Sequence, residues 1–257
     1  MSDGETVYER DGVVARITFN RPGARNAMTW QMYEQLAEAC AKVARDTEVR
    51  VAVFRGAGGK SFVAGTDIAQ FKTFTADDGV AYEARMESFL DALEKLRVPT
   101  IAVVEGWAIG GGLAIAACCD FRIATPGARF GVPIARTLGN CLSMANYARI
   151  VTSVGTANAK RLLVLGDTIT AEEAKGSGFV LDVVAPDVID VWVTELCERL
   201  ARNAPVTMRV SKEAIRRLLH ATLPEDEDLI RAAYGSEDFR QGVRAFVEKR
   251  QPKWTGK

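Results

Sequence analysis

The sequence has very little histidine and no excess of charge. His220 is the only histidine among 257 residues, and 33 Lys and Arg residues balance 33 Asp and Glu residues. None of the five cysteines forms a C-x-x-C pair, so neither a structural zinc site nor any other metal site is expected. The balanced charge gives no basis for binding nucleic acid or an anionic membrane.

Long hydrophobic runs are also missing. No apolar segment reaches the roughly 20 residues that a membrane-spanning helix needs. The first residues, MSDGETVYERDG, are polar and lack the apolar region of a signal peptide. We therefore expect a cytoplasmic protein with reduced cysteines, in which Cys118 and Cys119 act as small buried apolar residues. A chain of this length buries roughly 70–75% of its unfolded surface, which is enough to fold without disulfides.

Glycine, in contrast, is concentrated at one informative place. An apolar, β-branched run at 100–104 predicts a buried strand, and the segment 113–119, apolar on every face, predicts a buried helix. Three glycines at 110–112 lie between them, so a ligand can approach the free N–H groups of the helix start. Such a helix start suits an anion or a polarised carbonyl oxygen. The glycines can equally serve only the close packing of a helix on a sheet.

A second stretch, SFVAGTDIAQF at 61–71, has the same character. Gly65 interrupts it, and Asp67 is placed to cap a helix that starts at Ile68. Each of the two stretches joins a predicted strand to a helix. If the two helix starts converge on one point, their N–H groups form a two-donor oxyanion hole.

The remaining pattern predicts a core of strands and helices followed by helices alone. Asp-Gly at 11–12 joins two β-prone runs and indicates a hairpin, while Thr29 is placed to cap a helix over 30–45. We expect 134–140 to be a loop. The other predicted elements are strands at 51–55, 121–124, 129–132 and 179–184 and helices at 81–96, 142–150, 156–165, 188–201, 206–219, 226–234 and 238–249. No low-complexity linker separates the two parts, a core over 1–186 and a helical region over 187–257 packed on it.

Several motifs, in this order and spacing, resemble the crotonase superfamily, the enoyl-CoA hydratase/isomerase family. They are NRPGARNAM at 20–28, SFVAGTDI at 61–68, VVEGWAIGGGLAIAACCDFRIA at 103–124, FGVP at 130–133, LLVLGDTITAEEAKGSGFVLDVV at 162–184 and AFVEKRQPKW at 245–254. The resemblance covers nearly the whole chain. It implies an α/β crotonase-like spiral of repeated ββα turns, with a C-terminal helical region used to form a homotrimer or a dimer of trimers.

The resemblance also implies an acyl-CoA thioester substrate, with coenzyme A as part of it and no separate cofactor. The backbone N–H groups of Thr66 and Gly111 would form the oxyanion hole, in which one donor typically contributes about 2.7–4 kcal/mol. Arg25 would contact a phosphate, and Phe246 and Lys249 would reach coenzyme A from the same or a neighbouring subunit. The full set expected to bind substrate is Arg25, Asn26, Ala27, Ala64, Ile68, Trp107, Gly110, Ile134, Asn140, Phe246 and Lys249.

Two positions depart from the family's pattern. The hydratases that the chain resembles have two glutamates that add water across the double bond. The corresponding positions here hold Ala114 and Ile134, or Ala135 if the loop is shifted by one residue. Water addition needs a base for the nucleophile and an acid for carbon, and neither side chain can transfer a proton. The substitutions therefore argue against ordinary hydration and weaken the case for isomerisation.

Other polar residues could supply part of the chemistry. Asp67 follows the expected oxyanion residue but is better explained as a helix cap, and Glu105 is better explained as a solvated or ion-paired turn carboxylate. Arg136 could bind a substrate carboxylate or face solvent. The open functions are an enzyme that forms an enolate by decarboxylation, thioester hydrolysis, C–C cleavage or another reaction, a non-catalytic acyl-CoA-binding protein, and a structural trimer. Decarboxylation is attractive because it generates the enolate without a base.

Overall fold

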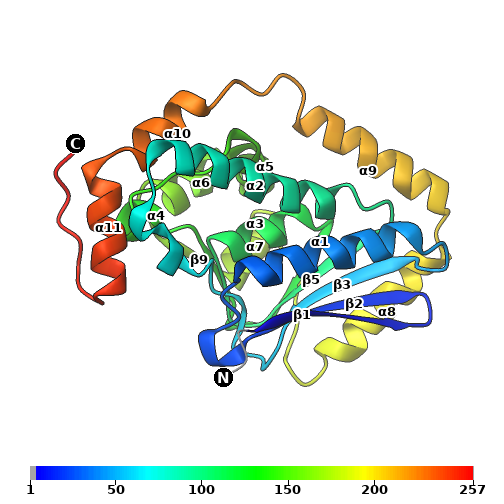
Figure 1. Cartoon of the computed structure of the whole chain (residues 1–257). Coiled ribbons are helices and arrows are strands. Elements are labelled where there is room, and N and C mark those ends of the chain that lie inside the picture. The colour runs from blue at the N-terminus through cyan, green and yellow to red at the C-terminus, as the bar shows by residue number, and fades with distance from the viewer. Residues whose placement is uncertain (1–3, 257) are drawn as a thin grey trace.

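Two β-sheets and the helices around them make up residues 4–256, which are the residues that the computed structural model describes, apart from the side chains of 69–70 (Figure 1). The six-stranded sheet has the order β1-β2-β3-β5-β7-β10, and the four-stranded sheet has the order β4-β6-β8-β9. The strands are β1 Glu5–Asp11, β2 Val14–Asn20, β3 Val51–Gly56, β4 Ser61–Val63, β5 Thr100–Val104, β6 Trp107–Ile109, β7 Phe121–Ala124, β8 Arg129–Gly131, β9 Thr168–Thr170 and β10 Asp182–Val183.

From β3 to β8, consecutive strands alternate between the two sheets, and this alternation winds the chain into a spiral. In each of the pairs β3–β4, β5–β6 and β7–β8, the first strand joins the six-stranded sheet and the second joins the four-stranded sheet. Strands of successive turns pair in parallel, β3 with β5 and β5 with β7 in one sheet, β4 with β6 and β6 with β8 in the other. The predicted spiral of ββα turns is confirmed, as is the hairpin of β1 and β2.

Several helices begin at polar caps that the sequence supplies. Thr29 accepts a hydrogen bond from the Met32 amide, as predicted, and Thr75 with Asp78 forms a capping box at the start of α2. The helices are α1 Trp30–Arg45, α2 Ala76–Glu94, α3 Gly111–Cys118, α4 Ile134–Thr137, α5 Met144–Val154, α6 Thr156–Leu163, α7 Ala171–Gly176, α8 Ile189–Arg202, α9 Pro205–Leu219, α10 Glu227–Tyr234 and α11 Glu237–Val247. Short 3-10 turns cover Pro22–Ala24 (η1) and Ile68–Thr73 (η2).

Helix α3 is the buried centre of the fold, as its all-apolar sequence predicts. It packs against α2, α5 and the four-stranded sheet. Gly112 allows this close contact, because a Cβ atom there would lie 2.0 Å from the Val63 carbonyl oxygen. Cys118 and Cys119 are buried and free, which confirms the prediction for them.

The C-terminal helices take three different positions. Helix α8 covers one face of the six-stranded sheet and forms a separate apolar cluster with it (Figure 1). Helix α10 packs on α2, and α11 packs on η2 and α4. Helix α9 extends along one side of the molecule and leaves apolar residues exposed: Val206, Val210, Ile215 and Leu218. Within residues 4–256, no helix combines the length and apolar character needed to cross a membrane.

Some expectations about local structure are wrong. The predicted loop 134–140 begins with a helical turn, α4, in which the Thr137 hydroxyl donates to the Pro133 carbonyl. Residues 107–109 form the short strand β6, which was not among the predicted elements, because they pair with strands on both sides. The strand expected at 179–184 is reduced to β10. These segments are too short for side-chain periodicity to reveal their structure.

Candidate active site

Two glycine-containing loops meet beside the N-terminus of α3. One holds Gly65 and Thr66, and the other holds Gly110 and Gly111. The Met28 amide donates to the Gly65 carbonyl (2.9 Å), and the Asp67 amide donates to the Met28 carbonyl (2.8 Å). This bridge leaves the Thr66 N–H unused, and the N–H of Gly111, the first residue of α3, has no partner within its helix. The two residues predicted to supply the donors therefore lie beside each other.

The backbone of both loops depends on glycine. Gly65 has φ +108° and Gly110 has φ +56°, in the region that side chains disfavour. A Cβ atom on Gly110 would lie 3.9 Å from the Gly65 Cα, so the two loops touch. This contact places Thr66 and Gly111, the residues that follow the two glycines, close together.

The Tyr33 hydroxyl lies against both donor residues. It shares a hydrogen bond of 2.8 Å with the Thr66 hydroxyl, and it would be 2.4 Å from a Cβ atom on Gly111. Burial raises the pKa of the Tyr33 phenol well above its ordinary value, so the group stays neutral. Tyr33 thus fixes the spacing of the two loops without adding charge.

We expect Gly111→Ala to lower activity and stability, by about 1–3 kcal/mol of unfolding free energy, because its methyl group overlaps the Tyr33 hydroxyl. Tyr33→Phe should rescue part of both losses, since the Tyr33 Cζ is 3.8 Å from the same Cβ position. Thermal unfolding and turnover of the two single variants and the double variant measure the effect. Equal losses in Gly111→Ala and in the double variant would contradict this account.

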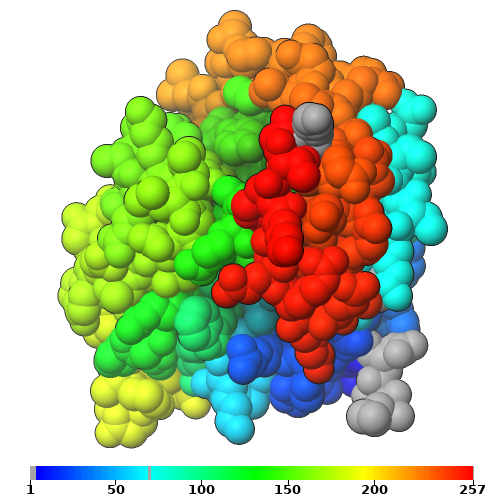
Figure 2. All heavy atoms as spheres, turned by 90° about the vertical axis from the view of Figure 1, so that its left-hand side faces the viewer, coloured from blue at the N-terminus to red at the C-terminus, as the bar shows by residue number. Residues whose placement is uncertain are grey.

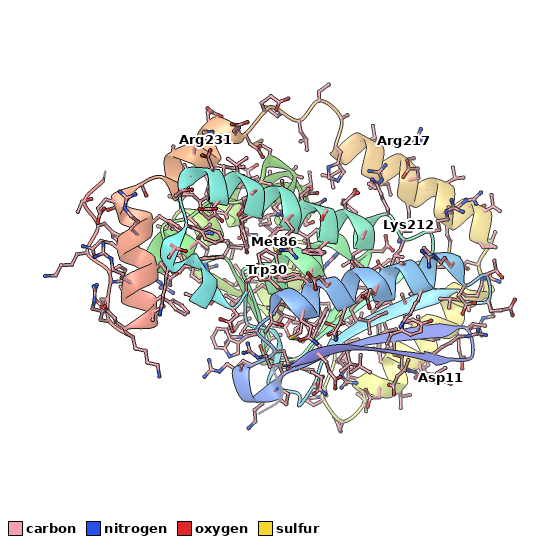
Figure 3. The ribbon with its side chains drawn as sticks, in the orientation of Figure 1. Asp11, Trp30, Met86, Lys212, Arg217 and Arg231 are labelled. Carbon is pink, nitrogen blue, oxygen red and sulfur yellow. The ribbon has the colours of Figure 1, made fainter. Side chains whose placement is uncertain are left out.

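A cavity of about 150 Å³ opens directly in front of the two N–H groups. Its walls come from the loops, α2, α4, the start of α5 and the end of α11. Among the residues predicted to bind substrate, those that line it are Ala64, Ile68, Gly110, Ile134, Asn140 and Phe246, together with the oxyanion residues Thr66 and Gly111. Met86 lines it from the inner side of α2 (Figure 3). Ala114 also lines it, so both positions where a glutamate would be expected face the cavity with apolar side chains.

The C-terminal segment closes one side of this cavity in the same chain. Phe246 on α11 lines it together with Pro133 and Thr137 near α4. Figure 2 shows the corresponding face, where the C-terminal segment lies beside the segment around α4 with a narrow hollow between them. Phe246 therefore lines the cavity of its own chain, while its contact with coenzyme A, from the same or a neighbouring subunit, stays a prediction.

The structure does not bring two of the predicted catalytic side chains into the cavity. Arg136 is exposed on α4, because Ile134, Thr137 and Leu138 occupy the inward face of that helical turn. Asp67 forms an ion pair with Arg21 at 3.1 Å and is not among the described lining residues. Glu105, the other candidate, accepts a hydrogen bond from Arg55 at 2.6 Å, which agrees with an ion-paired turn carboxylate.

Several predicted substrate-binding residues also lie elsewhere. Trp107 is exposed on β6 and is not among the described residues that line the cavity. Asn26 is fully buried, and its amide bonds backbone groups of Arg21, Ala57 and Ser61, so its side chain has a structural role. The others, at the surface or partly buried and not among these lining residues, are Arg25, Ala27 and Lys249. Their contact with coenzyme A stays a prediction.

One carboxylate in the cavity wall was missed by the sequence analysis. Glu83 on α2 is only 3% exposed, accepts a hydrogen bond from the Tyr234 hydroxyl (2.6 Å) and another from the Ser143 amide (3.1 Å), and lines the cavity. Burial raises its pKa to about 7, although the two hydrogen bonds act in the opposite direction. A signal existed: Glu83 precedes Met86 by three residues, so it lies on the apolar face of its helix.

We expect Glu83→Gln to gain stability relative to the unaltered protein as the pH rises from 5 to 8. The folded-state pKa is raised from 4.5 to about 7. Between these values the folded protein keeps a proton that the unfolded chain releases, so its stability falls with rising pH. The shift corresponds to roughly 3 kcal/mol. Urea unfolding of both proteins at pH 5 and pH 8 measures the difference in their free energies of unfolding. The same difference at both pH values would contradict the prediction.

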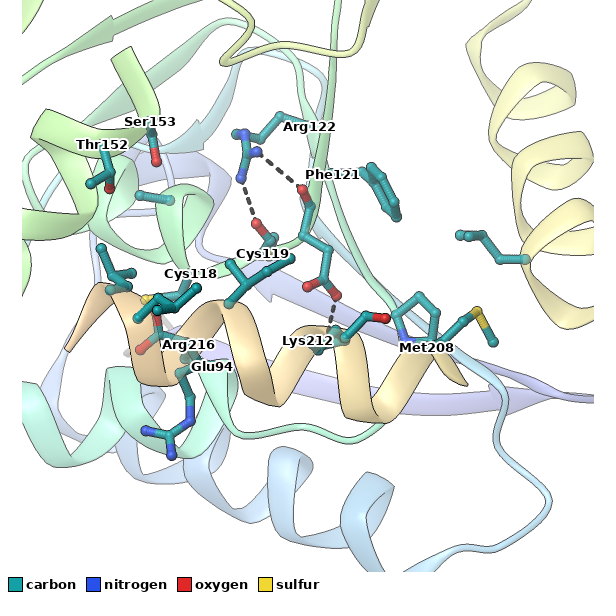
Figure 4. A pocket seen from close by; sticks show the side chains of 18 of the residues that line it. Glu94, Cys118, Cys119, Phe121, Arg122, Thr152, Ser153, Met208, Lys212 and Arg216 are labelled. Atoms are coloured by element: carbon teal, nitrogen blue, oxygen red, sulfur yellow. Dashed lines mark hydrogen bonds and ion pairs between the residues drawn. The ribbon is translucent and has the colours of Figure 1, made fainter. Parts of the chain in front are cut away.

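A larger cavity of about 740 Å³ lies away from the glycine loops, between α9, the end of α3 and β7. Figure 4 shows its lining, where Lys212 of α9 binds the Asp120 carboxylate and Arg122 donates to the Cys119 and Asp120 carbonyls. Asp120 also accepts hydrogen bonds from the amide and hydroxyl of Thr100. These contacts join α9 to the spiral core. The polar groups are used in packing, and the described lining contains neither oxyanion donor.

Known proteins resemble the chain over nearly its full length. The sequence profile described as Enoyl-CoA hydratase/isomerase matches residues 9–257. A short-chain-enoyl-CoA hydratase of Clostridium acetobutylicum is 34% identical, with 98% of this chain and 97% of that protein covered. A crystal structure of an enoyl-CoA hydratase/carnithine racemase from Magnetospirillum magneticum is 35% identical, with a TM-score of 0.79 over 97% of this chain and 95% of that one. A methylmalonyl-CoA decarboxylase complexed with 2S-carboxypropyl-CoA is 28% identical, with a TM-score of 0.90 over all of both chains.

Proposed function

The chain belongs to the enoyl-CoA hydratase/isomerase family and is an acyl-CoA enzyme with the crotonase fold, and on that premise we propose that it stabilises a thioester enolate between the Thr66 and Gly111 amides. The observation that carries the proposal is the meeting of the two loops. They place two unused N–H groups at the mouth of one small, mostly apolar cavity. An acyl chain bound there would present its thioester oxygen to both donors.

The electrostatics of the loops favour a negatively charged oxygen. Negative charge accumulates on the thioester oxygen as the enolate forms, and fixed donors in a site with little water stabilise that charge strongly. The Gly111 N–H also carries the partial positive charge of the α3 terminus. Tyr33, held neutral by burial, keeps the donors in place without competing for the oxygen.

Decarboxylation is the second candidate function. Ala114 and Ile134 leave no proton-transfer group at the two positions that the family resemblance assigns to the hydratase glutamates. Loss of carbon dioxide generates an enolate without a base at either position. The TM-score of 0.90 to a methylmalonyl-CoA decarboxylase favours this candidate by backbone shape.

Incubating the purified protein with crotonyl-CoA, malonyl-type CoA esters and β-ketoacyl-CoA esters, with detection by mass spectrometry, tests both candidates. A product formed by loss of carbon dioxide supports decarboxylation, and addition of water to crotonyl-CoA would contradict the argument from Ala114 and Ile134. Release of free coenzyme A would indicate thioester hydrolysis, and cleavage of the β-ketoacyl ester would indicate C–C bond cleavage. Binding of every ester without turnover would indicate a non-catalytic acyl-CoA-binding protein.

We also propose that the chain assembles as a homotrimer or a dimer of trimers. Helix α9 supports this, because Val206, Val210, Ile215 and Leu218 are between 57% and 78% exposed. A row of exposed apolar side chains on one helix is typical of an interface. Sedimentation equilibrium measures the mass in solution, and a monomer at micromolar concentration would contradict the proposal.

A further inference from the structure

Glu83 is the one carboxylate among the described residues that line the cavity. It reaches the cavity wall from α2, whereas the two oxyanion donors come from the loops before η2 and α3. The side chain is almost completely buried, at 3% exposure. A carboxyl group is costly to bury in an apolar wall, so its presence needs a physical explanation.

Hydrogen bonds hold the Glu83 carboxyl in a fixed orientation. The Tyr234 hydroxyl donates to one oxygen at 2.6 Å and the Ser143 amide donates to the other at 3.1 Å. The Asn140 side-chain amide in turn donates to the Tyr234 hydroxyl at 3.3 Å. Each carboxylate oxygen can accept more than one hydrogen bond. The Glu83 carboxyl therefore keeps free lone pairs and can still take or give a proton.

The other acidic groups nearby are used differently. Glu87 and Glu94 bind the buried Arg149 guanidinium, and Asp226 accepts a hydrogen bond from the Met144 amide. The remaining titratable groups close enough to influence Glu83 are Tyr33, Tyr82, Cys141, Tyr147 and Tyr234. Burial raises the pKa of each of these five, so they are neutral at pH 7. Glu83 is therefore the group in the wall that can change its protonation near neutral pH.

We propose that Glu83 is the catalytic acid–base that exchanges a proton with the carbon beside the thioester carbonyl. The inference rests on the proposed function, since it needs an acyl-CoA ester held at Thr66 and Gly111. The Glu83 carboxylate takes the proton of that C–H bond, and the C–H electron pair forms the enolate, whose oxygen accepts from the two amides. The protonated carboxyl then returns the proton to the same carbon or to a conjugated one.

The protonation state of Glu83 suits this role. Its pKa of about 7 keeps comparable amounts of acid and carboxylate at neutral pH, which is the condition for efficient general acid–base catalysis. A single such group can move a double bond, or can protonate the enolate left after carbon dioxide is lost. Hydration needs a second group to activate water. The structure thus favours acyl-CoA substrates whose reaction transfers one proton at carbon.

Deuterium exchange into butyryl-CoA tests the proposal, because exchange at the carbon beside the carbonyl needs an enolate but no net reaction. The protein is incubated with butyryl-CoA in D₂O, and incorporation is followed by mass spectrometry. We expect exchange by the unaltered protein and a loss of at least about 100-fold in Glu83→Gln, with butyryl-CoA affinity within a few-fold by calorimetry. Asp91→Asn, on the same helix but paired with Lys95 at the surface, should exchange normally.

Exchange by Glu83→Gln at the normal rate would overturn the assignment of Glu83 while leaving the oxyanion hole standing. Absence of exchange by the unaltered protein would also overturn it, and absence of butyryl-CoA binding as well would count against the proposed function itself.

Tyr234→Phe gives a second test if Glu83→Gln does not fold. Removing the Tyr234 hydrogen bond should raise the Glu83 pKa, so the midpoint of the exchange rate against pH should move upward from about 7. If the midpoint of the exchange rate against pH were the same in Tyr234→Phe and in the unaltered protein, the proposal would be contradicted.

Discussion

Thr66→Pro is expected to lower the rate of deuterium exchange into butyryl-CoA by about 10²–10³-fold, the effect of removing one oxyanion donor. Proline has no N–H, and the bridge to Met28 uses the Gly65 carbonyl and the Asp67 amide. The local pairing therefore does not depend on the atom that is removed. The ester should still bind, because the rest of the cavity wall is unchanged, so the loss should appear in the rate at saturating ester.

Thr66→Val is the matched control. It keeps the backbone N–H and the approximate volume of the side chain but loses the 2.8 Å hydrogen bond to the Tyr33 hydroxyl. We expect it to reduce exchange by less than about tenfold, the size of one lost neutral hydrogen bond. If Thr66→Val were as slow as Thr66→Pro, the side chain and not the amide would be the important group at this position.

Arg149→Met is expected to destabilise the protein by about 3–5 kcal/mol, because it leaves two partly buried carboxylates without the cation that they share. The Arg149 side chain is 1% exposed and binds Glu87 at 2.5 Å and Glu94 at 2.8 Å. Glu94 also contacts His220 at 2.8 Å. Urea denaturation measures the loss in free energy of unfolding.

Arg202→Met is the control for this prediction. Arg202 and Glu198 are 3.8 Å apart, with side chains 72% and 63% exposed. Pairs of this kind contribute less than about 1 kcal/mol. A combined Arg149→Met, Glu87→Gln, Glu94→Gln variant should recover part of the lost stability, since it removes the unpaired charges. Equal losses in Arg149→Met and Arg202→Met would show that the buried cluster does not behave as a charge network.

The oxyanion loops could be predicted from sequence because their signals are local. The glycines at 110–112 stand between a buried strand and an all-apolar helix, and Gly65 with Thr66 repeats the arrangement one turn earlier in the spiral. Their convergence depends on the parallel pairing of β4 with β6, which places the ends of the two strands side by side. The two glycine-containing motifs, each at the end of a predicted strand, were enough to predict that the loops occupy equivalent places in successive turns of the spiral.

Ile134, Asn140 and Phe246 were expected at the site and do line the cavity, but contacts between distant segments could not be predicted in this way. Glu83 meets Tyr234, 151 residues away, and its place on the apolar face of α2 was too weak a signal to single it out. Arg136 was favoured over its neighbours for its charge, yet the turn of α4 directs Ile134 and Thr137 inward. The position of a residue around the helix axis decides whether its side chain faces the cavity. A four-residue helix is too short for the sequence to reveal those positions by periodicity.

The position of α10 and α11 determines when the cavity is completed during synthesis of the chain. The two oxyanion loops lie within the first half of the sequence, but Tyr234 and Phe246 emerge near its end. Domains fold as units during synthesis, so the Glu83 carboxyl acquires its tyrosine only after α10 has left the ribosome, long after both glycine loops have been made. The cavity would therefore be completed in a single late step, when the last two helices are in place.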